Sequence, residues 1–178
     1  FYVRGGTWNI DFEKIGYMPK KISVQITEFD KNKPTDVRLE KVAGLVVTDQ
    51  LKADLVKGNS LFDEHKYEEA IAVYQNIVTA NPEAFVIYQN IGNCYFELGK
   101  YDLAEESFKK VLEKDPKNAQ GMLLIGNCYA NRGDNDKAMD WYSQIEFDKI
   151  TDQMALFNIG SRFYSQSKFE EALKYYKK

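Results

Sequence analysis

The sequence contains little of what most catalytic and metal-binding sites are built from. It has two cysteines and one histidine among its 178 residues. A structural zinc site needs a close set of Cys or His ligands, and no such set is present. The pair Gly5-Gly6 reads as a turn and not as a nucleotide-binding motif. Because we also find no Ser/His/Asp set and no paired carboxylates, we expect no catalytic residues, no metal and no cofactor.

Strong charge of one sign and long apolar runs are also lacking. The formal net charge is −3, so the chain has no basic field that would attract nucleic acid. No run of about 18 apolar residues occurs, and the sequence therefore predicts no transmembrane segment. The chain starts at Phe1 within an apparent strand and ends at Lys178 within a repeated pattern. We therefore expect it to be part of a longer protein, whose compartment cannot be read from these ends.

What the sequence does have is a repeat with a period of 34 residues. The segment "IGNCY" begins at Ile91 and begins again at Ile125. A shift of one period aligns four glycines, four alanines and four large aromatic residues without an insertion. The aligned residues are Gly58, Gly92, Gly126 and Gly160; Ala70, Ala104, Ala138 and Ala172; and Tyr74, Phe108, Tyr142 and Tyr176. Such self-similarity indicates a solenoid of stacked units.

Each unit reads as a pair of helices. In the second unit, Tyr88, Ile91 and Tyr95 recur at the spacing of one helical face. Gly99 then interrupts the pattern, as expected at a helix end, and Pro116 closes the unit because proline cannot continue a helix. The aligned glycines and alanines are small, which allows two helices to approach closely where they cross. Thr48 is expected to cap the first helix.

These residues resemble the tetratricopeptide repeat family, whose period and Leu-Gly, Tyr, Ala, Phe and Pro positions they match. The resemblance implies a mainly α fold, with about three and a half repeats forming a solenoid over residues 48–178. The repeats are expected at about 51–84, 85–118, 119–152 and 153–178. Some positions depart from the family pattern, including Asp54, His65, Asn135 and Ile150.

The two cysteines occupy the same position in adjacent repeats. The interpretation we favour is that this position requires a small, semi-buried residue, since Cys behaves as a small hydrophobe. A disulfide between Cys94 and Cys128 would need Cα atoms within about 7 Å, which equivalent points on stacked units are not expected to reach. His65 is expected to be a solvated residue of a turn between helices.

The first fifty residues change from a helical period to an alternating one. Segments 7–13, 22–26 and 36–42 alternate apolar and polar residues as strands do, and residues 1–4 could form another strand. The stretch 5–26 resembles the second half of a carboxypeptidase regulatory-like domain, a small non-catalytic β-sandwich. We therefore expect an incomplete antiparallel β-sandwich over residues 1–44, with Leu45 and Val46 covering the first repeat.

Solenoids of this kind usually bind proteins, and the resemblance implies a concave groove lined by the first helix of each unit. The residues expected in this groove lie opposite the packing face. They are Leu55, Asn59, Phe62, Gln89, Asn93, Phe96, Glu97, Leu123, Asn127, Asn131, Phe157, Ser161 and Tyr164. We refer to these thirteen residues as the predicted groove.

Three asparagines one repeat apart, Asn59, Asn93 and Asn127, form a ladder in the predicted groove. Amides both donate and accept hydrogen bonds, which suits the backbone of an extended peptide. The alternative is that these asparagines only bond to neighbouring helices. Family members that clamp a C-terminal carboxylate use basic residues where this chain has Leu55, Gln120 and Leu124, so a clamp of that kind is not expected.

Three functions remain open from the sequence. The chain is expected to be a non-enzymatic scaffold that binds a partner protein or peptide. The alternative is a structural subunit, built into a filament or envelope assembly by end-to-end stacking or strand exchange with copies of itself. An enzyme is the least supported. The pairing of the two domain types resembles bacterial exported proteins, which implies a periplasmic, cell-envelope or extracellular location.

Overall fold

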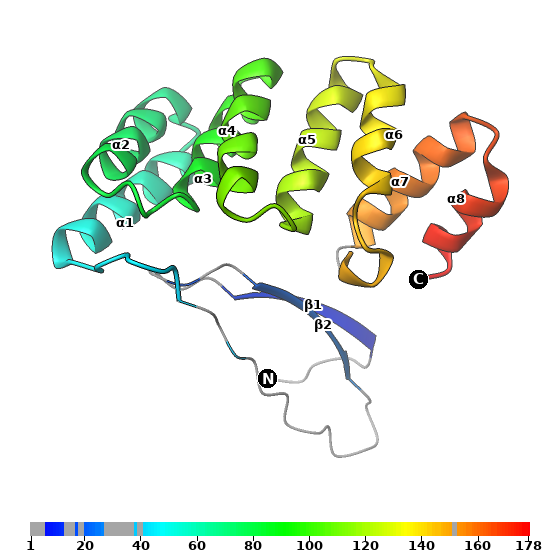
Figure 1. Cartoon of the computed structure of the whole chain (residues 1–178), viewed down its shortest axis with the longest axis horizontal. Coiled ribbons are helices and arrows are strands. Elements are labelled where there is room, and N and C mark those ends of the chain that lie inside the picture. The colour runs from blue at the N-terminus through cyan, green and yellow to red at the C-terminus, as the bar shows by residue number, and fades with distance from the viewer. Residues whose placement is uncertain (1–5, 13–16, 18–19, 27–37, 39–40, 151–152) are drawn as a thin grey trace.

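The protein was analysed as a computed structural model that describes residues 6–12, 17, 20–26, 38, 41–150 and 153–178. Within these residues, eight α-helices follow a short β-hairpin. Figure 1 shows the helices in a row that follows their order in the sequence, from α1 in cyan to α8 in red. The protein is therefore mainly α, and each helix packs against the next one along the chain.

The helices form four pairs, and each pair corresponds to one predicted repeat. Their bounds are α1 Asp49–Asp63 and α2 Tyr67–Ala80, α3 Ile87–Glu97 and α4 Tyr101–Lys114, α5 Ala119–Asn131 and α6 Asn135–Ser143, and α7 Gln153–Ser165 and α8 Phe169–Tyr176. The third pair ends early, and the 3-10 helix η1 (Phe147–Lys149) replaces the last turns of α6. No described helix is long and apolar enough to span a bilayer.

The ends of the helices follow from local chemistry. The Leu51 backbone N–H donates to the Thr48 side-chain oxygen at 3.1 Å, which confirms Thr48 as the N-cap of α1. The turn inside each pair contains one residue with positive φ: His65, Gly99, Gly133 and Ser167. His65 is exposed in its turn, as predicted, and its Nδ1 is hydrogen-bonded to the Tyr67 hydroxyl at 2.8 Å.

The four aligned glycines occupy the same environment in all four pairs. Each lies against the large aromatic residue of its own second helix: Gly58 on Tyr74, Gly92 on Phe108, Gly126 on Tyr142 and Gly160 on Tyr176. A Cβ built on Gly160 would lie 2.6 Å from a ring carbon of Tyr176, closer than non-bonded carbon atoms pack. The glycine therefore allows the two helices of each pair to cross at contact distance.

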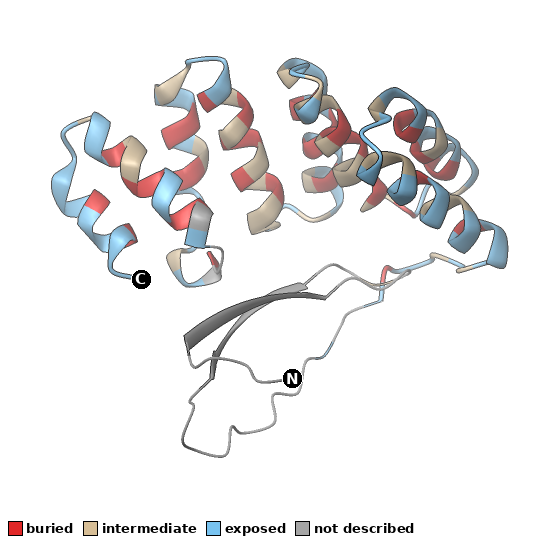
Figure 2. Ribbon diagram, turned by 180° about the vertical axis from the view of Figure 1, so that it is seen from behind, coloured by how far each residue is buried: buried red, intermediate tan, exposed pale blue. Residues whose placement is uncertain are grey.

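The core is formed by buried residues of successive helices, whose positions are coloured red on the ribbon in Figure 2. The alanines of the second helices and the aromatic residues beside them are almost completely buried in the first three pairs. Cys94 and Cys128 are buried in the same core and are free thiols, which confirms their predicted packing role. Burial raises the pKa of both thiols to about 12, so they stay protonated at neutral pH.

At the N-terminus, β1 (Gly6–Phe12) pairs antiparallel with β2 (Lys20–Ile26), with Trp8 opposite Val24. Tyr17 and Lys41 form an isolated antiparallel bridge. Residues 1–4 and most of 36–42 lie outside the described residues, so the further strands expected there are not tested. The two described strands form a single layer, which does not support the β-sandwich expected over residues 1–44.

The junction before α1 differs in detail from the prediction. Leu45 packs against the core of the first repeat, as predicted. Val46 does not cover this repeat, because 72% of it is exposed. The buried residue is instead Val42, which lies on the other side of the turn at Gly44. A chain that reverses at Gly44 with positive φ directs Val42 inward and leaves Val46 in solvent.

The packing glycines generate a prediction about stability. Gly126→Ala should lower the free energy of unfolding by about 1–3 kcal/mol, because the new methyl group would overlap the Tyr142 ring. Alanine otherwise favours a helix over glycine by about 1 kcal/mol, so a loss would identify the ring contact as its cause. Urea unfolding followed by circular dichroism measures the change.

Gly121→Ala in the same helix is the matched control. Its Cβ would lie 3.0 Å from the Cδ2 methyl of Leu112, whose flexible side chain can move away, and 3.4 Å from Asn118 Oδ1. The loss of stability should therefore be smaller at Gly121 than at Gly126. A Gly126→Ala variant as stable as the wild type would show that the close crossing is not required.

Candidate functional site

The candidate binding surface is formed by the first helices of the pairs, which carry all thirteen residues of the predicted groove. Its apolar members differ in accessibility. Phe157 and Tyr164 in α7 are the most open, at 59% and 60% exposed. Leu55, Phe62 and Phe96 are half-buried and pack partly on the core. Leu123 is only 8% exposed within the core cluster, so it offers little surface to a partner.

The polar residues of the predicted groove are either half-buried or exposed. Asn59, Glu97 and Asn131 are exposed, whereas Gln89, Asn93, Asn127 and Ser161 are half-buried. Glu97 is the only charged residue among the thirteen. The predicted groove is therefore polar, weakly acidic and interrupted by apolar patches, which suits the backbone of a bound segment better than a highly charged ligand.

The asparagine ladder is held by the second helices. The Tyr74 hydroxyl donates to Asn59 Oδ1 at 2.7 Å, and the Tyr142 hydroxyl donates to Asn127 Oδ1 at 2.8 Å. In the fourth pair the Tyr176 hydroxyl donates to Ser161 Oγ at 3.2 Å. These bonds fix the orientation of both amides, whose side-chain N–H groups make no hydrogen bond among the residues that the structure describes. At these positions the asparagines therefore do bond to a neighbouring helix, as the alternative interpretation of the ladder expected. This bonding does not exclude a ligand.

The second pair breaks this pattern. Phe108 stands where the other pairs have tyrosine and has no hydroxyl to donate. Asn93 is half-buried, and among the described residues its side chain makes no hydrogen bond. Its amide therefore keeps both its acceptor and its donors for another molecule. Asn93 is the member of the ladder whose removal would disturb the fold least.

A second repeated feature borders this surface. The end of the first helix and the start of the second carry an edge-to-face aromatic pair in three of the four units. The ring centroids are 5.4 Å apart in Phe62–Tyr67, 5.3 Å in Phe96–Tyr101 and 5.2 Å in Tyr164–Phe169. The third unit has Ala130 and Asn135 at these positions, so the row of rings has a gap there.

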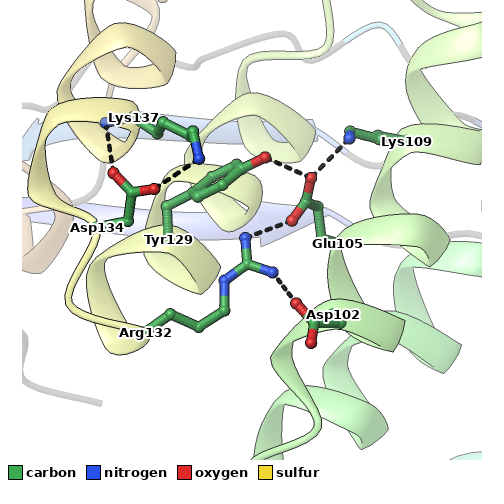
Figure 3. A network of polar contacts seen from close by, with 7 residues as sticks. All are labelled: Asp102, Glu105, Lys109, Tyr129, Arg132, Asp134 and Lys137. Carbon is green, nitrogen blue, oxygen red and sulfur yellow. Dashed lines mark hydrogen bonds and ion pairs between the residues drawn. The ribbon is translucent and has the colours of Figure 1, made fainter.

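A polar network joins the second and third units and was not predicted from the sequence (Figure 3). Its centre is Glu105 in α4, a carboxylate only 7% exposed. Glu105 accepts hydrogen bonds from the Tyr129 hydroxyl at 2.7 Å and from Arg132 at 2.5 Å, and it pairs with Lys109 at 2.6 Å. The guanidinium of Arg132 also bonds Asp102 and lies 4.3 Å from the Tyr129 ring centroid.

The network keeps Glu105 ionised. Burial on its own would raise the pKa of Glu105, but the hydrogen bonds from Lys109, Tyr129 and Arg132 outweigh it and lower that pKa. The equivalent position is apolar in the other pairs, where it is Ile71, Met139 and Leu173. Alignment of the repeats could therefore have flagged Glu105 as the exception, although the spacing alone does not reveal its partners.

The titration of Glu105 predicts a pH dependence. A carboxylate with a lowered folded pKa adds stability above its unfolded pKa of about 4.3, and this stability is lost as the pH falls through the folded value. Glu105→Gln should therefore lower the free energy of unfolding at neutral pH by about 1–3 kcal/mol. The difference from the wild type should shrink below about pH 4.

Urea unfolding across this pH range tests the prediction, with Glu106→Gln as the control. Glu106 is the next residue in α4, is exposed, and makes no ion pair among the described residues. Its substitution should change stability little at any of these pH values. A Glu105→Gln deficit that stays constant down to acid pH would show that the charge of Glu105 is not what matters.

Comparisons with known proteins agree with the helical architecture. Residues 85–118 and residues 107–140 each match a family model described as tetratricopeptide repeat. A solved structure titled MamA 41-end, from Desulfovibrio magneticus RS-1, is 16% identical and has a TM-score of 0.61, covering 71% of this chain and 72% of that one. A crystal structure of MamA is 21% identical with a TM-score of 0.63, covering 72% and 75%.

A further structure is titled the first TPR of Spaghetti (RPAP3) bound to the HSP90 peptide SRMEEVD. It is 22% identical with a TM-score of 0.60, and the match covers 70% of this chain and 99% of that one. A search of curated proteins found no match. At these identities the structural likeness shows a shared fold and not a shared ligand.

Proposed function

We propose that the helical part of this chain, in which residues 85–140 match tetratricopeptide repeat models, is a non-enzymatic scaffold that binds an extended segment of a partner protein along its first-helix surface. The tetratricopeptide fold serves protein–protein interaction, and one structural neighbour holds a peptide. The observation that carries the proposal is the asparagine ladder. The amides of Asn59 and Asn127 are oriented by Tyr74 and Tyr142, and the Asn93 side chain makes no hydrogen bond within the described part of the chain.

Backbone recognition follows from this arrangement. Main-chain carbonyl groups of an extended segment are acceptors, and donors repeated along the solenoid suit them. The half-buried Phe62 and Phe96 and the exposed Phe157 and Tyr164 would contact apolar side chains of the segment. A carboxylate clamp remains unexpected because Leu55, Gln120 and Leu124 occupy its basic positions. The location outside the cytoplasm stays a prediction.

The ladder generates a binding prediction. Peptides selected from a displayed random library on the wild-type chain should bind Asn93→Ala about five- to tenfold more weakly, because the lost amide leaves a peptide backbone group unpaired. Fluorescence anisotropy with the selected peptides measures the change. Since Asn93 makes no bond within the described residues, the variant should unfold at the same temperature as the wild type.

Asn76→Ala is the matched control for this experiment. Asn76 is exposed in α2, a second helix, and lies outside the predicted groove. Its substitution should leave peptide affinity unchanged. Equal affinity of the wild type and Asn93→Ala would count against the ladder as a recognition surface, and failure to select any peptide would count against the scaffold itself.

The alternative function, a subunit that stacks end to end, has one observation in its favour. Phe169, Leu173 and Tyr176 of α8 are exposed large apolar residues, and Leu173 aligns with Ile71 and Met139, which lie buried between units. The opposite end does not match this face. On α1, the exposed Lys57 stands where the later units have a buried isoleucine. The exposed Ser60 stands where they have a buried cysteine or the half-buried Arg162.

The polar face of α1 thus opposes head-to-tail stacking, since burying Lys57 against an apolar surface would be costly. We predict that the chain keeps a constant molar mass over a wide range of concentrations. Size-exclusion chromatography with light scattering measures this. Growth into large species as the concentration rises would favour the assembly over the scaffold.

A further inference from the structure

Arg162 is a charged residue at a position that the other units keep small. In α7 it aligns with Cys94 and Cys128, which are buried in the core. The arginine is too large and too polar for that position, and its side chain instead reaches the start of α6. There Arg162 Nη1 donates to Asn135 Oδ1 at 2.8 Å. A guanidinium has five N–H donors, and within the described residues the Arg162 side chain uses only one of them.

The charge of Arg162 is not matched by a carboxylate. At the previous junction, Arg132 is paired with both Asp102 and Glu105. Within the described part of the chain, Arg162 makes no ion pair of this kind. The acidic residue that aligns with Asp102 is Asp136, and it accepts a hydrogen bond from Gln166 Nε2 at 3.3 Å instead. Arg162 is therefore a half-buried cation with donors to spare.

Arg162 contacts the gap in the row of aromatic pairs. Asn135 takes the position that an aromatic ring fills in the other three units, and its Oδ1 accepts the hydrogen bond from Arg162. Burial raises the pKa of Tyr142 to about 12, and the charge of Arg162 opposes this rise. The hydroxyl of Tyr142 donates to Asn127 of the ladder. In α7, Arg162 directly follows Ser161, which belongs to the predicted groove.

We propose that Arg162 and Asn135 form a binding site for an acidic side chain of the bound partner segment. A carboxylate accepts two parallel hydrogen bonds from the edge of a guanidinium, the strongest pairing available to arginine. This inference rests on the proposed function, because it names the chemistry of the same partner. The site is separate from the positions of Leu55, Gln120 and Leu124, where other family members bind a C-terminal carboxylate.

The charges of the surface also give the partner a direction. Glu97 of the second unit is exposed and makes no ion pair within the described residues, and it would repel an acidic group nearby. The acidic residue of the partner therefore lies at the end formed by the third and fourth units. Uncharged or basic residues of the segment lie over the second unit.

A double-mutant cycle on selected peptides tests this inference. Peptides are selected on the wild-type chain from a displayed random library, and each is synthesised with its Asp or Glu and with the corresponding amide. Affinities are measured by fluorescence anisotropy for the wild type, Arg162→Gln and Arg162→Cys. Arg162→Cys introduces the residue that the second and third units carry at this position. It should therefore fold even if Arg162→Gln does not.

The acidic peptides should bind both Arg162 variants about tenfold more weakly than the wild type, whereas the amide peptides should bind all three proteins equally. The matched control is Lys168→Gln, which removes the same charge from an exposed residue of the fourth unit and should have a much smaller effect. Equal losses for acidic and amide peptides, or selected peptides without an acidic preference, would overturn the site while leaving the scaffold intact. If no peptide can be selected, the proposed function fails and the site fails with it.

Discussion

The contact on which the rest of the structure depends is the one between a glycine of each first helix and an aromatic ring of the second. The ring of Tyr142 fills the space that a side chain on Gly126 would need, so the two helix axes can cross closely. The same contact occurs in all four pairs. Because each pair then has the same shape, the pairs stack with a common geometry. Residues at equivalent positions are thereby placed in equivalent surroundings.

The ring also connects the core to the binding surface. Where it is tyrosine, as at Tyr74 and Tyr142, its hydroxyl emerges from the core and orients an asparagine of the ladder. Where the ring is Phe108, it fills the core equally well, but it has no hydroxyl group that could bond to Asn93. One atom of the second helix thus decides whether an amide on the first helix is engaged or available. The packing and the recognition chemistry are coupled through that hydroxyl.

The repeating part of the structure could be predicted from the sequence, because periodicity reports shared surroundings. Gly126, Ala138 and Cys128 recur at fixed intervals, and each was correctly expected to lie in the core. The exceptions could not be predicted in the same way. Glu105 and Arg162 were visible as departures from the repeat, but their partners Arg132 and Asn135 lie 27 residues away in the chain and depend on how two units meet. Periodicity also says nothing about the first fifty residues, where the β-sandwich was not supported.

The two arginines show how such departures acquire different roles. Arg132 meets Glu105 and Asp102, so its charge is neutralised inside the protein and strengthens one junction. Removing either partner of such a pair is costly because an unpaired charge is left behind. Arg162 faces an amide, and its charge is left for a molecule outside the chain. In a solenoid whose units share one shape, specificity therefore has to come from the few positions where a unit differs from its neighbours.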